Sequence, residues 1–161
     1  MTTRKSLPKI TKIEKIDNNF LYLKYLIQKC LFELTARDTN LKYLFHGTSK
    51  NKPEVIYTNP IGFDMRYSNA GLWGKGIYFA ANANYSNNYA YVNGSERKIF
   101  LCEVILGTCT EKTENTNSEI IKPKNGYDTV SAYAGNSDIY IKYENSFVYP
   151  SYLISYVCHE T

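Results

Sequence analysis

Histidine is scarce in this chain of 161 residues, and one of its two copies stands in a distinctive place. His46 closes a short apolar run, Tyr-Leu-Phe at residues 43–45, and Gly47 and Thr48 follow it. A glycine lets the backbone approach a ligand closely, and functional residues concentrate on loops held by a rigid scaffold. His46 is therefore a candidate functional residue, although a histidine at a strand end is more often structural. His159, near the C-terminus, is expected to be a solvated tail residue.

A second candidate begins at Gly74 with the sequence Gly-Lys-Gly-Ile-Tyr-Phe-Ala. It lacks the features of a Walker loop and of a Rossmann fingerprint, so a turn entering a strand is a sufficient explanation of its glycines. Beyond it, Tyr78, Tyr85, Ser86 and Tyr89 fall within twelve residues. Aromatic rings with a neighbouring hydroxyl suit a flat heteroaromatic carboxamide, which needs stacking and hydrogen bonds at its edge. Packing of a tyrosine-rich helix is the alternative interpretation.

The elements that must position these side chains follow from apolar periodicity and from turn residues. Apolar side chains at helical spacing predict a helix over 20–34 whose core-facing stripe is Leu23, Leu26, Ile27, Cys30, Leu31 and Leu34. Short helices are predicted over 53–58 and 82–91, the latter exposed, and loops over 62–76 and 108–126. Strands are predicted at 43–45, 76–80, 97–106, 127–133, 139–143 and 152–157. One helix followed by many strands indicates an α+β fold with a largely antiparallel sheet.

Composition limits the classes of protein to which this chain can belong. With 43% apolar and 15% aromatic residues, 161 residues suffice for one globular domain, which we assign to 10–161 behind a flexible lead at 1–9. The net charge of +4 is scattered, so nucleic-acid binding is possible but not indicated. Neither a signal peptide nor a membrane span is evident, and an intracellular protein, cytoplasmic or nuclear, is expected.

The four cysteines show no close pairs of the kind that hold structural zinc. No metal site is expected. Cys102 and Cys158 lie in apolar, strand-like runs, and buried free thiols are the default interpretation of both.

Four motifs in a fixed order identify a family. They are Leu-Phe-His-Gly-Thr at 44–48, Gly-Phe-Asp-x-Arg at 62–66, Gly-Lys-Gly-Ile-Tyr-Phe-Ala at 74–80, and Ser-x-x-Tyr at 86–89. Together they resemble the catalytic domain of the poly(ADP-ribose) polymerase family. Residues 10–21 look like its entry into the first helix, Tyr-Asp-Thr-Val at 127–130 resembles the strand motif ahead of the active-site loop, and 149–156 resembles the closing strand of mono-transferase members.

The resemblance implies the ADP-ribosyltransferase fold, a mostly antiparallel split sheet with an N-terminal helix and short flanking helices. It also implies NAD as co-substrate. His46 matches the histidine that bonds ribose hydroxyls, and Gly47 the glycine whose backbone clamps the carboxamide. Tyr78 matches the triad tyrosine, Ser86 the serine on the carboxamide, and Tyr89 the ring that stacks on nicotinamide.

Three further residues are expected to contact NAD. Thr48 and Ala80 belong to the matched motifs, and Arg66 could fork onto the pyrophosphate, although a solvated loop arginine is nearly as good an interpretation.

The third position of the family triad is where this chain departs from polymerising members. The resemblance places Ile139 where they carry a glutamate, which would stabilise a cationic ribose and orient an acceptor hydroxyl. His46, Tyr78 and Ile139 thus form the His-Tyr-Ile pattern of mono-ADP-ribosyltransferases. Glu144 and Glu103 are weak substitutes: Glu144 is expected on the opposite side of its strand, and Glu103 at the surface or paired.

The expected activity is therefore transfer of a single ADP-ribose unit from NAD to an acceptor protein by a monomeric enzyme, with release of nicotinamide. Two alternatives remain. One is a catalytically weak module that binds NAD or ADP-ribose, and the other is a transferase acting on nucleic-acid ends. Acceptor choice is expected to depend on the short loop between Val130 and Ile139.

Overall fold

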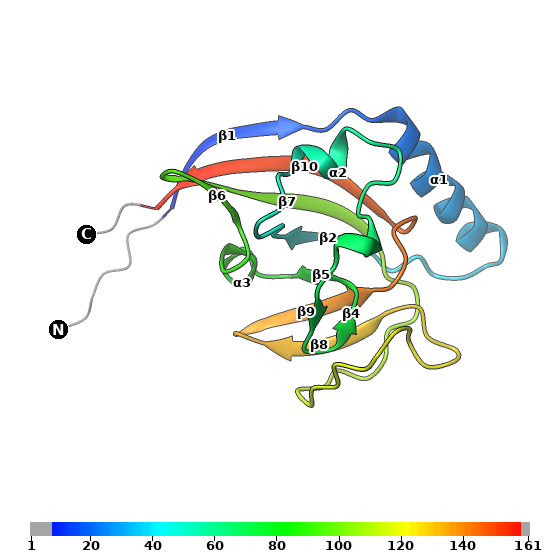
Figure 1. Ribbon diagram of the computed structural model, residues 1–161. Helices are drawn as coiled ribbons and strands as arrows, with labels where there is room; N and C mark the ends of the chain where they lie inside the picture. The colour runs from blue at the N-terminus through cyan, green and yellow to red at the C-terminus, as the bar shows by residue number, and fades with distance from the viewer. Residues whose placement is uncertain (1–7, 159–161) are drawn as a thin grey trace.

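The computed structural model describes residues 8–158, which form one large sheet, a separate two-stranded ribbon and few helices (Figure 1). The helices are α1 (Asn19–Leu34), α2 (Glu54–Tyr57) and α3 (Ala83–Asn87), with a 3₁₀ turn at Met65–Tyr67. The strands are β1 (Lys9–Lys15), β2 (Leu41–His46), β3 (Ala70–Gly71), β4 (Gly74–Lys75), β5 (Ile77–Ala80), β6 (Tyr91–Asn93), β7 (Glu96–Ile105), β8 (Val130–Ala134), β9 (Ser137–Lys142) and β10 (Val148–Val157). No helix within 8–158 has the length and apolar character needed to cross a membrane.

The main sheet is antiparallel and has a thin junction near its middle. Its strands run in the order β1-β10-β7-β2-β5-β9-β8, and β6 pairs with β7. While β7 and β10 share a long ladder, β2 and β5 are joined through a single residue pair, Phe45 and Ala80. Figure 1 shows the larger half of the sheet above, with β8 and β9 below it. The α+β class and the split antiparallel sheet are confirmed.

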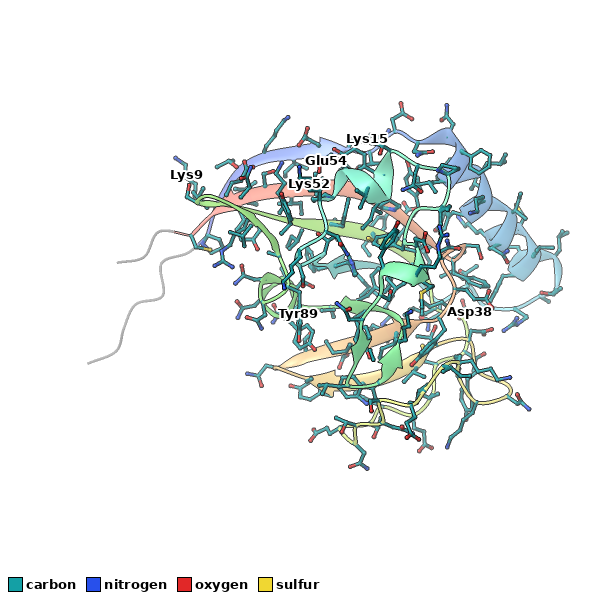
Figure 2. The ribbon with its side chains drawn as sticks, viewed as in Figure 1. Lys9, Lys15, Asp38, Lys52, Glu54 and Tyr89 are labelled. Atoms are coloured by element: carbon teal, nitrogen blue, oxygen red, sulfur yellow. The ribbon has the colours of Figure 1, made fainter. Side chains whose placement is uncertain are left out.

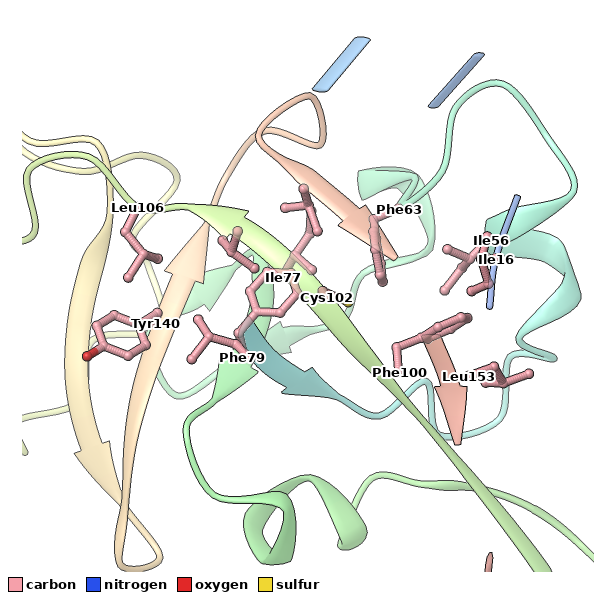
Figure 3. Packing of buried hydrophobic residues seen from close by; sticks show 13 residues of the cluster. Ile16, Ile56, Phe63, Ile77, Phe79, Phe100, Cys102, Leu106, Tyr140 and Leu153 are labelled. Atoms are coloured by element: carbon pink, nitrogen blue, oxygen red, sulfur yellow. The ribbon is translucent and has the colours of Figure 1, made fainter. Parts of the chain in front are cut away.

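The main apolar cluster lies across this junction and joins the two halves of the sheet (Figure 3). Phe100 and Cys102 of β7 pack with Ile77 and Phe79 of β5 and with Phe63 from the loop ahead of the 3₁₀ turn. All five side chains are at most 5% exposed. At about 25 cal/mol per Å² of apolar surface removed from water, such burial fixes both the strand order and the place where the halves part.

Helix α1 has the predicted length but turns a different face to the core. Asn18 caps its N-terminus by accepting the Leu21 N–H. The buried side chains are Leu21, Tyr25 and Phe32, which pack with Ile105 and Tyr149. The predicted stripe was wrong at all its positions except the half-buried Leu26: Leu23, Ile27, Cys30, Leu31 and Leu34 are exposed. The helix is apolar on most of its circumference, and two of its four aromatic side chains, Tyr25 and Phe32, occupy the face that is buried.

Four strands were not predicted, and one terminal boundary differs from expectation. The short strands β3 and β4 lie inside the loop expected over 62–76. Residues 9–15 form β1, which pairs with β10, so the flexible lead does not include Lys9; residues 1–7 lie outside the described part. The expected exposed helix at 82–91 is the shorter α3, with Ser86 buried, and Tyr91 already begins β6. His159 also lies outside the described residues.

The four cysteines are free thiols, and they differ in exposure. Cys102 is fully buried, Cys109 and Cys158 are half-buried, and Cys30 is exposed. The expectation of burial is therefore confirmed for Cys102 and was too strong for Cys158, which lies just beyond the end of β10.

The loop expected to select acceptors is a tight hairpin turn. Strands β8 and β9 are joined through Gly135 and Asn136, both with positive φ (54° and 59°). Two successive residues of this kind make the type I′ turn that suits the twist of a two-residue hairpin. Most of the short loop expected between Val130 and Ile139 is therefore regular strand, with a two-residue turn at its centre.

Candidate active site

A cavity of about 860 Å³ opens where the two halves of the sheet part. This volume falls within the range typical of small-molecule sites. Its lining consists of residues 46–49, 51, 55–56, 62–64, 67–72, 76–80, 85–86, 89 and 116–119. Of the residues expected to bind NAD, His46, Gly47, Thr48, Tyr78, Ala80, Ser86 and Tyr89 all lie in this lining. Arg66, which was also expected to contact NAD, and Ile139, the third triad position, do not lie in the lining.

The side chain of His46 is fixed by a hydrogen bond across the junction. Its Nδ1 lies 2.8 Å from the Tyr78 carbonyl oxygen, which can only accept, so Nδ1 carries the proton. The ring lies edge-on to Phe63 at 4.9 Å and tilted to Phe79 at 5.5 Å between centroids. Burial among these rings lowers the pKa of His46 to about 4. His46 is therefore neutral at physiological pH, with Nε2 free to accept a hydrogen bond.

Gly47 lies where no side chain fits. A Cβ on this residue would overlap the carbonyl oxygen of Tyr89 and come within 2.7 Å of the Ser86 carbonyl oxygen. Two residues on, the Ser49 N–H donates to the Tyr89 carbonyl at 2.7 Å. The segment after β2 is thus pressed against the end of α3, and the absence of a side chain at Gly47 is what allows this approach.

Helix α3 and the residues just after it supply an aromatic wall with a serine hydroxyl beside it. The Tyr85 and Tyr89 rings are 5.5 Å apart between centroids, and Tyr89 is 46% exposed. Figure 2 places Tyr89 beside α3 and next to the smaller half of the sheet. Ser86 is 3% exposed, and its hydroxyl makes no hydrogen bond within residues 8–158. The wall can therefore offer a ligand two ring faces and one unoccupied hydroxyl.

Tyr78 lines the cavity with its ring while its hydroxyl is engaged elsewhere. The hydroxyl accepts the Trp73 N–H at 2.8 Å and donates to the Gly74 carbonyl at 2.7 Å. Burial raises the pKa of Tyr78, so this donor stays protonated. Of the expected triad, His46 and Tyr78 meet through one hydrogen bond, and both face the cavity.

Ile139 stands behind the wall of the cavity. It pairs with Ala80 across β5 and β9 and is fully buried, packed in a second apolar cluster with Trp73 and Ile141. Neither weak substitute reaches the cavity: Glu103 accepts a hydrogen bond from Tyr43 on another part of the sheet, and Glu144 follows the end of β9.

The charged groups nearest the cavity are acidic. Asp64 and Glu119 contribute to its lining, to which no Lys or Arg of the described residues belongs. Arg66 is exposed and forks onto the Asp64 carboxylate, with its Nε 2.9 Å and one terminal nitrogen 2.6 Å from Oδ2. The Thr48 hydroxyl donates to the Asn51 carbonyl at 2.6 Å and so closes the turn that follows Gly47.

Some lining residues had no local signal in the sequence: residues 116–119 come from a polar segment that the sequence shows only as a loop. Phe63, part of the motif at 62–66, was not expected to be a site residue, and its ring touches His46. Trp73, the single tryptophan, was not predicted to be part of the site. It anchors the strand pair β3–β4 beside the cavity. No group of three or more potential metal ligands occurs within residues 8–158.

Comparison with known proteins agrees with the motif order and the split sheet. Residues 1–138 match the family model described as the poly(ADP-ribose) polymerase catalytic domain. The chain belongs to this family. The match ends one residue before Ile139, so it covers the first two triad positions and not the third.

Curated relatives align with nearly the whole chain. A protein named as a probable poly [ADP-ribose] polymerase of Dictyostelium discoideum is 34% identical over 91% of the chain and 44% of its own length. Human protein mono-ADP-ribosyltransferase PARP14 is 33% identical over 92% of the chain and 9% of its own length. The mouse protein mono-ADP-ribosyltransferase PARP12 is 30% identical over 91% of the chain and 21% of its own length. The chain thus spans less than half the length of each of these relatives.

Proposed function

We propose that this domain is an NAD-dependent protein mono-ADP-ribosyltransferase. The observation that carries the proposal is one cavity that unites a neutral histidine, an unoccupied serine hydroxyl and two neighbouring tyrosine rings, with His46, Ser86 and Tyr89 at the family's motif positions. The reaction breaks the bond between nicotinamide and ribose, joins the ribose carbon to an acceptor oxygen or nitrogen, and releases neutral nicotinamide and the proton that the acceptor loses.

The nicotinamide end would occupy the wall formed by α3. The Ser86 hydroxyl and the Gly47 backbone would contact the carboxamide. Tyr89 and Tyr85 offer ring faces on which the nicotinamide ring can stack. His46 offers Nε2 to a ribose hydroxyl. Because positive charge develops on the ribose as the bond breaks, a site that holds both rings in place lowers the barrier through orientation.

Transfer of a single unit is supported by the burial of Ile139. An isoleucine cannot accept a proton or hold an acceptor hydroxyl, and this one packs against Trp73 behind the cavity wall. Of the two carboxylates in the lining, Asp64 is held by Arg66. Under this proposal, no carboxylate stands at the third triad position to activate a second ribose, and extension of the product to a polymer is not expected.

Two measurements test the proposal. Incubation of the protein with labelled NAD should place label on protein and release nicotinamide in equal amount. Label on added nucleic acid would favour a transferase for nucleic-acid ends, and binding of NAD without release would favour a silent binding module. Ser86→Ala, which removes the free hydroxyl, should weaken NAD binding, because a lost hydrogen bond is worth about 0.5–1.5 kcal/mol.

A further inference from the structure

The strand pair β3–β4 forms one wall of the cavity and has very little sheet structure of its own. It is a two-stranded ribbon with only two residue pairs, Ala70 with Lys75 and Gly71 with Gly74. Isolated two-stranded ribbons are marginal in water. Since residues 67–72 line the cavity, whatever holds this ribbon in place also sets the shape of the binding site.

Two tyrosine hydroxyls bind the backbone of the same residue of this ribbon, Trp73, one at its N–H and the other at its carbonyl. The Trp73 N–H donates to Tyr78 Oη at 2.8 Å, and the Trp73 carbonyl accepts from Tyr143 Oη at 2.5 Å. Tyr78 Oη also donates to the Gly74 carbonyl at 2.7 Å. Three polar groups of the ribbon backbone are thus bound by Tyr78 of β5 and by Tyr143, just beyond the end of β9.

The Trp73 side chain holds the ribbon down as an anchor. It is 1% exposed and packs with Ile139 and Ile141, and its indole N–H donates to the Asn115 carbonyl at 2.9 Å. The ribbon fits closely around this anchor: a Cβ on Gly71 would come within 2.6 Å of the Tyr78 hydroxyl and ring. The Leu72 carbonyl accepts from the Asn117 N–H at 2.9 Å, which attaches the cavity residues 116–119 to the same ribbon.

We infer that Tyr143 is a positioning residue for the dinucleotide site, acting through the Trp73 peptide to hold the β3–β4 ribbon as a pre-formed wall. The inference rests on the proposed function for the identity of the ligand. Tyr143 itself is not part of the cavity lining. Burial raises the pKa of Tyr143 far above its usual range, so its hydroxyl remains a donor at every pH at which the protein would be assayed.

The test variant is Tyr143→Phe, which keeps the ring and removes only the hydroxyl. The matched control is Tyr140→Phe, within β9 and a few residues before Tyr143, where the hydroxyl accepts from Lys42 at 3.2 Å and not from the ribbon. Tyr143→Phe should raise KM and the dissociation constant for NAD about tenfold, leaving kcat within about twofold, and Tyr140→Phe should change neither. A tenfold change corresponds to about 1.4 kcal/mol.

Trp73 gives a second readout that needs no turnover. As the single tryptophan, it reports the ribbon alone, and in Tyr143→Phe its fluorescence should shift to the red and become more accessible to acrylamide. Equal NAD affinity and equal quenching in Tyr143→Phe and Tyr140→Phe would overturn the inference. If Tyr143→Phe does not fold, the native protein decides: strong quenching of Trp73 without NAD would contradict a pre-formed wall, and shielding would support it.

The same measurements separate this inference from the proposed function. If the native protein binds NAD but neither releases nicotinamide nor labels protein, the proposed transferase activity is refuted. The NAD affinities of the two variants still test the positioning role of Tyr143 in that case. A native protein that transfers ADP-ribose with identical KM in both variants retains the function and refutes the role of Tyr143.

Discussion

The substitution Ile139→Glu places a carboxyl group at a position where the structure has no room for a charge. Ile139 is fully buried between Ala80 and the cluster around Trp73. A glutamate there would have to stay protonated at pH 7, and raising its pKa by about three units costs about 4 kcal/mol. With native domains stable by about 5–15 kcal/mol, this variant should lose much of its stability.

The assay is urea unfolding at pH 7 and at pH 4.5, with Ile139→Gln as the uncharged control of similar size. The folded state holds a proton on the introduced carboxyl group, which the unfolded chain releases above pH about 4.3. The loss of unfolding free energy caused by the glutamate should therefore be present at pH 7 and largely vanish at pH 4.5. The Ile139→Gln variant should show no such pH dependence. An Ile139→Glu variant as stable as the native protein at pH 7, and able to build polymers, would refute the placement of Ile139 behind the wall.

Three further predictions concern His46, Gly47 and Lys142. Because burial holds the pKa of His46 at about 4, the acid limb of kcat/KM should lie below pH 6, and an apparent pKa between 6 and 7 would contradict its neutral state. Gly47→Ala should weaken NAD binding at least tenfold, since its Cβ would overlap the Tyr89 carbonyl; titration calorimetry would show unchanged affinity if the contact were unimportant. Burial lowers the pKa of Lys142 to about 8, so between pH 8 and 9.5 the unfolded chain binds more protons and the free energy of unfolding should rise by about 2 kcal/mol. A flat urea midpoint over that range would show that Lys142 is solvated.

The parts of the fold that sequence reasoning recovers are those determined locally. The helix predicted over 20–34 is found at Asn19–Leu34, because an N-cap and a continuous apolar run define it without help from the rest of the chain. His46 ends its strand as expected. The face of α1 could not be derived in the same way, since which of its many apolar residues meet the sheet depends on Ile105 and Tyr149, which are far away in sequence.

The candidate site likewise has a part that the sequence motifs predict and a part that depends on contacts between distant residues. The motifs supply the residues on β2, β5 and α3, and the structure brings them to one cavity. The β3–β4 ribbon, the anchor at Trp73 and the approach of residues 116–119 depend on contacts over more than forty residues, such as the indole bond to Asn115. Burial of Ile139 likewise becomes visible only when its neighbours on β5 and in the ribbon are known.

The most direct test of the proposed function is mass spectrometry of protein acceptors after reaction with NAD, counting the ADP-ribose units on each modified side chain. The proposal predicts a single unit at every modified position, and no modification when His46→Ala replaces the native protein. Chains of two or more units on one side chain, or unmodified protein despite consumption of NAD, would contradict it.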